Sequence, residues 1–264
     1  MIDNMVSFFL SFFQNPSALG IGLAIAFGAV WLAAYRPPLF IFKKPWLWAV
    51  LVSSAILTLA AISFIQVPLQ VCAGQALSHF WSQEVIMRWI LLAAIPQILL
   101  SGLVQEGAKL VPVVVYWCRS GKSIDPKLGL VIGAVAGAGF GIFEAQWAHN
   151  TIFASGWSWE AVQTGGFWAL AGFWERFFAV AFHTASSALA GYGLARGWGW
   201  QFYLIASFLH GLVNYSVVLL QTGIFTAVQL EIYVAVLAML VTAWALWLRW
   251  RKSAAAADPA ISSL

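Results

Sequence analysis

The stretch GLVIGAVAGAGFGIFE, residues 129–144, decides the fold of this 264-residue chain. It is apolar up to its last residue, and glycine recurs in it every four residues, at Gly129, Gly133, Gly137 and Gly141. Small residues at this spacing let a neighbouring helix approach the backbone closely, as happens between transmembrane helices. Glu144 lies two helical turns beyond Gly137, on the same face. The stretch therefore predicts a membrane helix that carries a carboxylate into a helix bundle.

The rest of the chain has the composition of an integral membrane protein. Hydrophobic residues make up 62% of it and charged residues only 8%, with a mean hydropathy of +0.87. Soluble domains average about 25% charged residues. The 13 basic and 9 acidic side chains cannot cover a water-exposed surface that must also accommodate 20 Phe and 16 Trp. We expect the lipid bilayer to be the main surroundings of the chain, and the positive net charge does not indicate nucleic-acid binding.

Apolar stretches long enough to cross a hydrocarbon core, roughly 20 helical residues, recur along the chain. Because a spanning segment must satisfy its own backbone hydrogen bonds, these stretches are expected to be helices. We predict an all-α, polytopic bundle of about seven transmembrane helices, at about 17–35, 46–65, 86–118, 128–149, 167–195, 200–220 and 226–249. Residues 1–252 would form one domain and 253–264 a short disordered tail. The segment 66–84 is expected to lie along the outer interface.

Basic residues indicate the orientation of this bundle. Ten of the 13 follow the first, third, fifth and seventh spans: Arg36, Lys43, Lys44, Arg119, Lys122, Lys127, Arg196, Arg249, Arg251 and Lys252. The segments on the other side of the predicted spans contain none. By the positive-inside rule, the C-terminus is cytoplasmic and the N-terminus is outside. Cys72 and Cys118 then lie on opposite sides and cannot pair.

Five ionisable side chains lie inside the predicted spans, where each is costly: Glu106, Lys109, Glu144, His183 and His210. At about 1.5 Å per residue from the cytoplasmic ends, the two carboxylates and two imidazoles lie roughly 15–26 Å deep, at similar levels. Glu106 and Lys109 are three residues apart and can form an ion pair on one helix. We predict that these groups form one buried site.

Each of these residues, taken alone, also has a purely structural explanation. A Glu–Lys pair can lock a single helix, a membrane histidine often only bonds a neighbouring helix, and a glycine run often serves packing alone. Two carboxylates and two imidazoles at one depth favour a functional site. Charged residues near the predicted interfaces are expected to be solvated, and these are Glu84, Arg88, Glu160 and Glu231. Glu175, Arg176 and His149, near the outer ends of their spans, are second-tier candidates.

These residues also carry a family pattern. Residues 105–109, QEGAK, resemble the EExxK motif of the PrsW family of intramembrane proteases, and 139–144, GFGIFE, resemble its GFGxxE segment. The helix from Arg176 to His183 is similar to its R…H helix, and 210–214, HGLVN, to its closing HGxxN. The match covers roughly residues 100–220, and more distantly the chain resembles CAAX-type prenyl-protein proteases. It implies a catalytic core at about 86–220 and the cytoplasmic membrane of a prokaryote.

The resemblance implies a glutamic-type intramembrane endopeptidase that acts on membrane-inserted or membrane-proximal peptides. Glu106 and His183 would polarise the attacking water, and His210, with Asn214, would stabilise the oxyanion. Glu144 would orient a histidine or share the water, Lys109 would hold the charge of Glu106, and Gln105 and Arg176 would have supporting roles. No cofactor is favoured. Where the family usually has glutamate, this chain has Gln105, so either Glu106 alone suffices or the chain is an attenuated or inactive variant.

Two other interpretations remain open at the level of sequence. Glu144, His183 and His210 can bind Zn²⁺ with an open position for water, although the chain has no HExxH motif. Buried Glu, Lys and His residues also build proton-coupled carriers, which often contain an internal repeat that is missing here.

Overall fold

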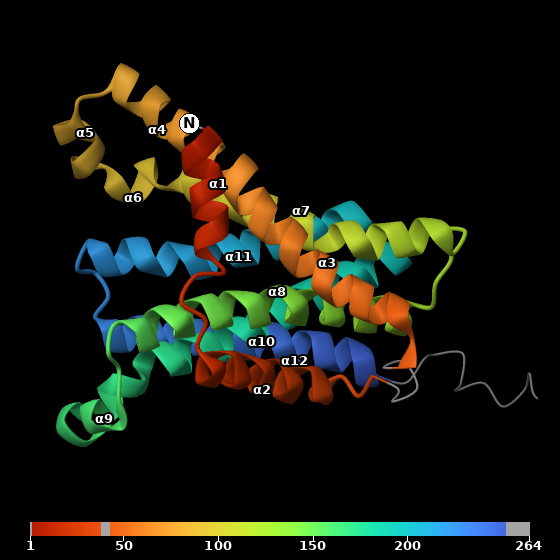
Figure 1. Cartoon of the computed structure of the whole chain (residues 1–264). Helices are drawn as coiled ribbons and strands as arrows, with labels where there is room; N and C mark the ends of the chain where they lie inside the picture. The colour runs from red at the N-terminus through yellow and green to blue at the C-terminus, as the bar shows by residue number, and fades with distance from the viewer. Residues whose placement is uncertain (1, 38–42, 252–264) are drawn as a thin grey trace, which may run out of the picture.

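The computed structural model describes residues 2–37 and 43–251, and these fold into a helix bundle without any strand among them (Figure 1). Lys252 and the predicted tail 253–264 lie outside the described residues. Within the described part, six helical stretches are long and apolar enough to cross a membrane, and α2 is a shorter apolar helix. This confirms an all-α membrane bundle of about seven spans.

Each of the seven predicted spans corresponds to one principal helix of the bundle, and several of these helices extend beyond the predicted bounds. These helices are α2 (Ala18–Ala34), α3 (Pro45–Ala61), α7 (Ile95–Arg119), α8 (Pro126–Ala154), α10 (Ala171–Ala195), α11 (Gly199–Gln221) and α12 (Ala227–Trp250). Local capping explains several of their starts. The Ser17 hydroxyl accepts a bond from the Gly20 amide, the Asp125 carboxylate caps α8, and Thr226 and Gln229 form a capping box on α12.

The segment after the second span differs from the prediction. Instead of ending near residue 65, α3 passes through a π-helix, η2 (Ile62–Gln66), into α4 (Val67–Phe80), which continues in a similar direction in Figure 1. The Val67 amide bonds to the Ile62 carbonyl, five residues back, just before Pro68. Proline lacks an amide hydrogen and its ring crowds the carbonyl four residues back, so a wider turn before it lets the helix continue.

The third predicted span, about 86–118, is wrong at its start. Two short helices, α5 (Gln83–Arg88) and α6 (Ile90–Ala93), precede α7 and are separated by Trp89, whose backbone is not helical. Pro96 lies in the first turn of α7, where its missing amide hydrogen does no harm. Short helices that the span pattern did not show also occur: α1 (Ile2–Ser11), α9 (Trp159–Gly165) and the 3₁₀-helix η3 (Gly166–Leu170).

The glycine stretch of α8 lies against α10 at the centre of the bundle (Figure 1). A side chain at Gly133 or Gly137 would overlap the carbonyl oxygens of Ser187 or His183, both on α10. Gly129 and Gly191 approach each other in the same way. These close approaches confirm that the four-residue glycine period is a packing face, and they fix the register of α8 against α10.

The loops that carry most basic residues meet at one end of the bundle. Arg249 Nε donates to the Tyr35 carbonyl at 3.0 Å, and Lys127 Nζ donates to the Arg251 carbonyl at 3.1 Å. Both cysteines are free and exposed, as expected for residues that cannot pair. The gathering of positive charge agrees with the charge pattern from which the orientation is predicted, although the direction of the bundle in a membrane stays a prediction.

Candidate active site

Glu106 of α7 is the centre of the site and is completely buried. Its Oε1 accepts hydrogen bonds from Lys109 Nζ at 2.5 Å and, across to α11, is 2.8 Å from His210 Nδ1. The Ser186 hydroxyl of α10 lies 3.3 Å from the same oxygen. The predicted ion pair between Glu106 and Lys109 is therefore present, and three helices supply partners to one carboxylate.

His183 of α10 connects this carboxylate to the second one. Its Nδ1 lies 3.2 Å from Lys109 Nζ, and its Nε2 lies 3.0 Å from Glu144 Oε2 on α8. Because an ammonium can only donate, contact with charged Lys109 makes Nδ1 the acceptor and leaves the proton on Nε2, facing Glu144. The imidazole is thus oriented from both sides.

Arg176 completes the arrangement on the far side of Glu144. Its guanidinium lies 3.1 Å from Glu144 Oε2 and also pairs with Glu175. Continuous polar contacts therefore run from Arg176 through Glu144, His183 and Lys109 to Glu106. The Glu144 and Arg176 side chains are 24% and 17% exposed, whereas Glu106 and Lys109 are closed off. In this arrangement the exposed edge of the site is therefore on the Glu144 and Arg176 side.

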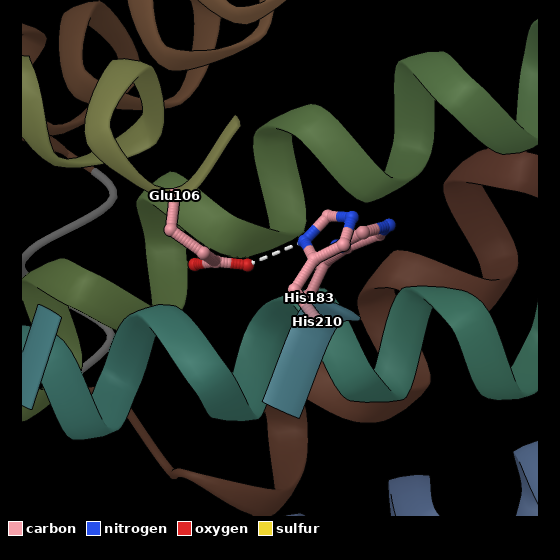
Figure 2. A group of neighbouring side chains, drawn as sticks. All are labelled: Glu106, His183 and His210. Atoms are coloured by element: carbon pink, nitrogen blue, oxygen red, sulfur yellow. Dashed lines mark hydrogen bonds and ion pairs between the residues drawn. The ribbon is translucent and has the colours of Figure 1, made fainter. Parts of the chain in front are cut away.

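Helix packing explains why these side chains meet. At Gly137 and Gly141 the backbone of α8 lies against α10 beside Val180 and His183, which brings Glu144 within reach of the imidazole. Figure 2 shows the two imidazoles of His183 and His210 side by side, with His210 bonded to Glu106. Their ring centroids are 5.3 Å apart. All four residues that the sequence singled out for chemistry thus lie in one cluster.

Other candidates have different surroundings. His149 bonds to the Gly20 carbonyl at 3.1 Å and packs on Phe173, which is a structural role. Asn214 donates to the Ser101 hydroxyl at 2.9 Å, and Gln105 donates to Gln66, so neither contacts the Glu–His cluster.

The charged residues expected at the interfaces differ in how exposed they are. Glu84, Arg88 and Glu160 are exposed, as expected. Glu231 instead has one carboxylate oxygen shielded and without a partner among the described residues.

Ser186 is a residue of the site that the sequence patterns did not predict. It lies three residues after His183, and this spacing places both side chains on one face of α10. The adjacent Ser187 is also buried, but its hydroxyl has no partner within the described chain. The three-residue spacing from His183 is the feature of the sequence that could have predicted Ser186 as part of the site.

The donor atoms that could hold a metal ion are not the predicted ones. Glu106, His183 and His210 each offer one ligand atom, and these atoms lie within 4.8 Å of one another. Glu106, and not the predicted Glu144, is thus the carboxylate of this possible metal site. Glu144 is turned toward Arg176 and toward Nε2 of His183. Two histidines and one glutamate are a common donor set of catalytic zinc. These three residues are therefore of the types that bind a metal ion. Lys109 Nζ contacts two of them, Glu106 and His183.

A polytopic membrane protein that buries carboxylate–imidazole pairs inside its bundle has a functional site there, of a kind found in intramembrane enzymes and in proton-coupled carriers. Comparison with known families makes the class specific: residues 43–245 match the PrsW family, described as intramembrane metalloproteases, and the chain belongs to that family. It is thus an integral membrane peptidase. No curated protein and no solved structure matches the chain.

Proposed function

We propose that this protein is an endopeptidase that hydrolyses a peptide bond of a membrane-inserted or membrane-proximal substrate, with Glu106, His183, His210 and Glu144 as its catalytic residues. The observation that carries the proposal is the buried cluster of two carboxylate–imidazole pairs joined through Lys109. A carboxylate beside an imidazole provides a base and an acid for proton transfer. Membership of the PrsW family supports the reaction class.

In this proposal a water molecule gives its proton to the Glu106 carboxylate as its oxygen attacks the carbonyl carbon. Negative charge then develops on the carbonyl oxygen, and the Nε2–H of His210 in its imidazolium form donates to it while Nδ1–H stays on Glu106, which lowers the barrier in a water-poor site. The C–N bond breaks when Glu106 passes the proton that it took from the water to the leaving nitrogen, which returns Glu106 to its carboxylate form. His183, which is held between Lys109 and Glu144, orients the water by exchanging one of these two contacts for it. Asn214 is not part of this step, because its amide contacts Ser101.

The test is cleavage of a synthetic single-span peptide by the purified protein in detergent. Glu106→Gln keeps the volume of the side chain and removes the base, so we expect activity to fall at least ~10²-fold. Glu84→Gln is the matched control, because Glu84 lies exposed on α5, and it should keep full activity. Full activity of a normally expressed Glu106→Gln protein would reject Glu106 as the base.

A zinc-dependent reaction is the second candidate, and the grouping of Glu106, His183 and His210 is the observation that favours it. These three residues would hold the ion, which would supply Lewis acidity to water and carbonyl groups. Since the Lys109 ammonium contacts Glu106 and His183, it would have to move aside. Elemental analysis separates the two chemistries: stoichiometric metal, with activity lost to strong chelators, supports zinc, and activity that survives chelation supports the glutamic reaction.

A further inference from the structure

A row of hydrogen-bonded glutamines runs from η2 and α4 to α7 and ends at Gln105, the residue before Glu106. Gln105 Nε2 donates to Gln66 Oε1 at 2.9 Å, Gln66 Nε2 lies 3.4 Å from Gln70 Oε1, and Gln70 Nε2 donates to the Gln97 carbonyl at 2.9 Å. We call these four residues the glutamine seam. Gln105 is the neighbour of Glu106 in sequence, so the seam connects directly to the backbone that positions the proposed base.

The far end of the seam opens into a cavity of about 380 Å³. Its lining contains the polar residues Ser78, Gln83, Gln97 and Gln221. Its lining residues come from α4, α5, α6, α7 and α11, and of these α4, α5 and α6 form the projecting part of the molecule at the top left of Figure 1. A polar route therefore extends from an open cavity to the residue next to Glu106.

The seam holds a hydrogen-bond acceptor that is not used. Gln105 is only 7% exposed, yet its Oε1 has no partner among the described residues. A buried carbonyl oxygen without a donor is costly, so such an atom in a native protein calls for a partner. A glutamate at position 105 could not donate to Gln66 as the present amide does. Gln105 therefore donates to Gln66 where an ionised glutamate would only accept.

The helix on one side of the seam is loosely held. No residue of α4 is buried, and none of α5 or α6 is, throughout these fully described elements. The π-helix η2 joins α4 to the well-packed α3, and π-turns within helices are frequent at functional sites. Elements with few buried contacts open at low free-energy cost. The seam can thus open where Gln70 of α4 meets Gln97 of α7, while Gln66 stays buried on η2 and the Glu–His cluster stays intact.

We infer that the glutamine seam binds the backbone of an unwound substrate segment and leads it to Glu106; this rests on the proposed peptidase function. A peptide bond inside a helix is shielded, so the segment must unwind, and its amide and carbonyl groups then need partners in a medium without water. Each glutamine offers two donor hydrogens and an acceptor, which matches a peptide group. The seam carries no charge, so it recognises backbone rather than charged side chains.

The test is a double-mutant cycle between the seam and the backbone of the substrate. Gln66→Leu and Gln70→Leu are each assayed on a single-span peptide and on versions with one backbone amide replaced by an ester. We expect each substitution to raise KM roughly threefold to tenfold, the scale of one hydrogen bond, with kcat little changed. An ester that raises KM in the parent protein should have no further effect in the variant whose glutamine it contacted. Gln75→Leu, on the exposed side of α4, should leave KM unchanged.

Other outcomes overturn the inference without touching the peptidase proposal. Unchanged KM in Gln66→Leu and Gln70→Leu, or ester effects that simply add, would reject backbone binding. A fall in kcat alone would mean that the seam delivers water. If the parent protein cleaves no peptide, cross-linking still decides: a benzophenone side chain at position 78, in the cavity, should capture the peptide far more efficiently than one at position 75. Equal capture would reject the seam as a binding site.

Discussion

At the scale of single residues, Lys109 is the most informative side chain. It is fully buried, and its ammonium contacts both Glu106 and His183, so one cation joins the two carboxylate–imidazole pairs. A buried charge pair contributes little net stability, but removing one partner leaves the other charge uncompensated. We therefore propose that the lysine acts chiefly to compensate the charge of Glu106 and to hold the His183 ring in one orientation.

This role predicts an asymmetric response to mutation. Lys109→Met should destabilise the protein by roughly 3–5 kcal/mol and abolish cleavage, because the charge of Glu106 is left without its cation. The double variant Lys109→Met/Glu106→Gln should recover much of the stability and none of the activity. Unfolding in detergent and peptide cleavage measure the two effects. Lys122→Met, at an exposed turn, is the control, and a double variant less stable than Lys109→Met would contradict the explanation.

The residues of the site could be found from sequence largely because charge is costly in a membrane. Glu106, Glu144, His183 and His210 stood out as ionisable groups inside apolar spans, and the structure brings them together. Spacing along one helix also predicted the Glu106–Lys109 pair. What sequence could not provide was rotation between helices: Asn214 contacts Ser101 and Glu144 contacts Arg176, and both outcomes depend on how packed helices face each other.

At the scale of elements, the bundle depends on how closely α8 and α10 approach. The glycines of α8 bring its backbone against the carbonyls of α10, and this contact sets Glu144 opposite His183. Helix existence was predictable here from hydropathy. Helix ends were less so, because the π-turn before Pro68 and the break at Trp89 depend on local backbone geometry that average hydropathy does not register.

The α8–α10 contact makes a prediction about single methyl groups. Gly137→Ala should destabilise the protein by about 1–3 kcal/mol and lower activity, because the new Cβ would overlap the His183 carbonyl oxygen. Gly22→Ala on α2 adds its methyl to open space, so it should be neutral or slightly stabilising. Thermal unfolding and cleavage of both variants, side by side, give the answer. Similar mild effects at the two positions would mean that the glycine spacing is incidental.

At the scale of the whole molecule, the basic loops and the cavity of the glutamine seam lie toward opposite ends of the bundle. Loops rich in Arg and Lys meet at one end of the bundle, where Arg249 contacts Tyr35 and Lys127 contacts Arg251. The cavity at the end of the glutamine seam lies toward the opposite end, beside α4 and α5. If the basic end is cytoplasmic, as the positive-inside rule predicts, substrate segments reach the seam from the outer half of the membrane.

The two cysteines test this orientation. Cys118 is near the end of α7, next to the basic turn at 119–127, whereas Cys72 lies on α4, about 40 Å along the continuous helix from Pro45. Both are exposed. An impermeant thiol reagent added to intact cells should therefore label Cys72 and spare Cys118, and Cys118 should react once the membrane is opened. A Cys72→Ala protein should lose the outside labelling altogether. Labelling of Cys118 in intact cells would invert the topology, and the seam would then receive its substrates from the cytoplasmic half.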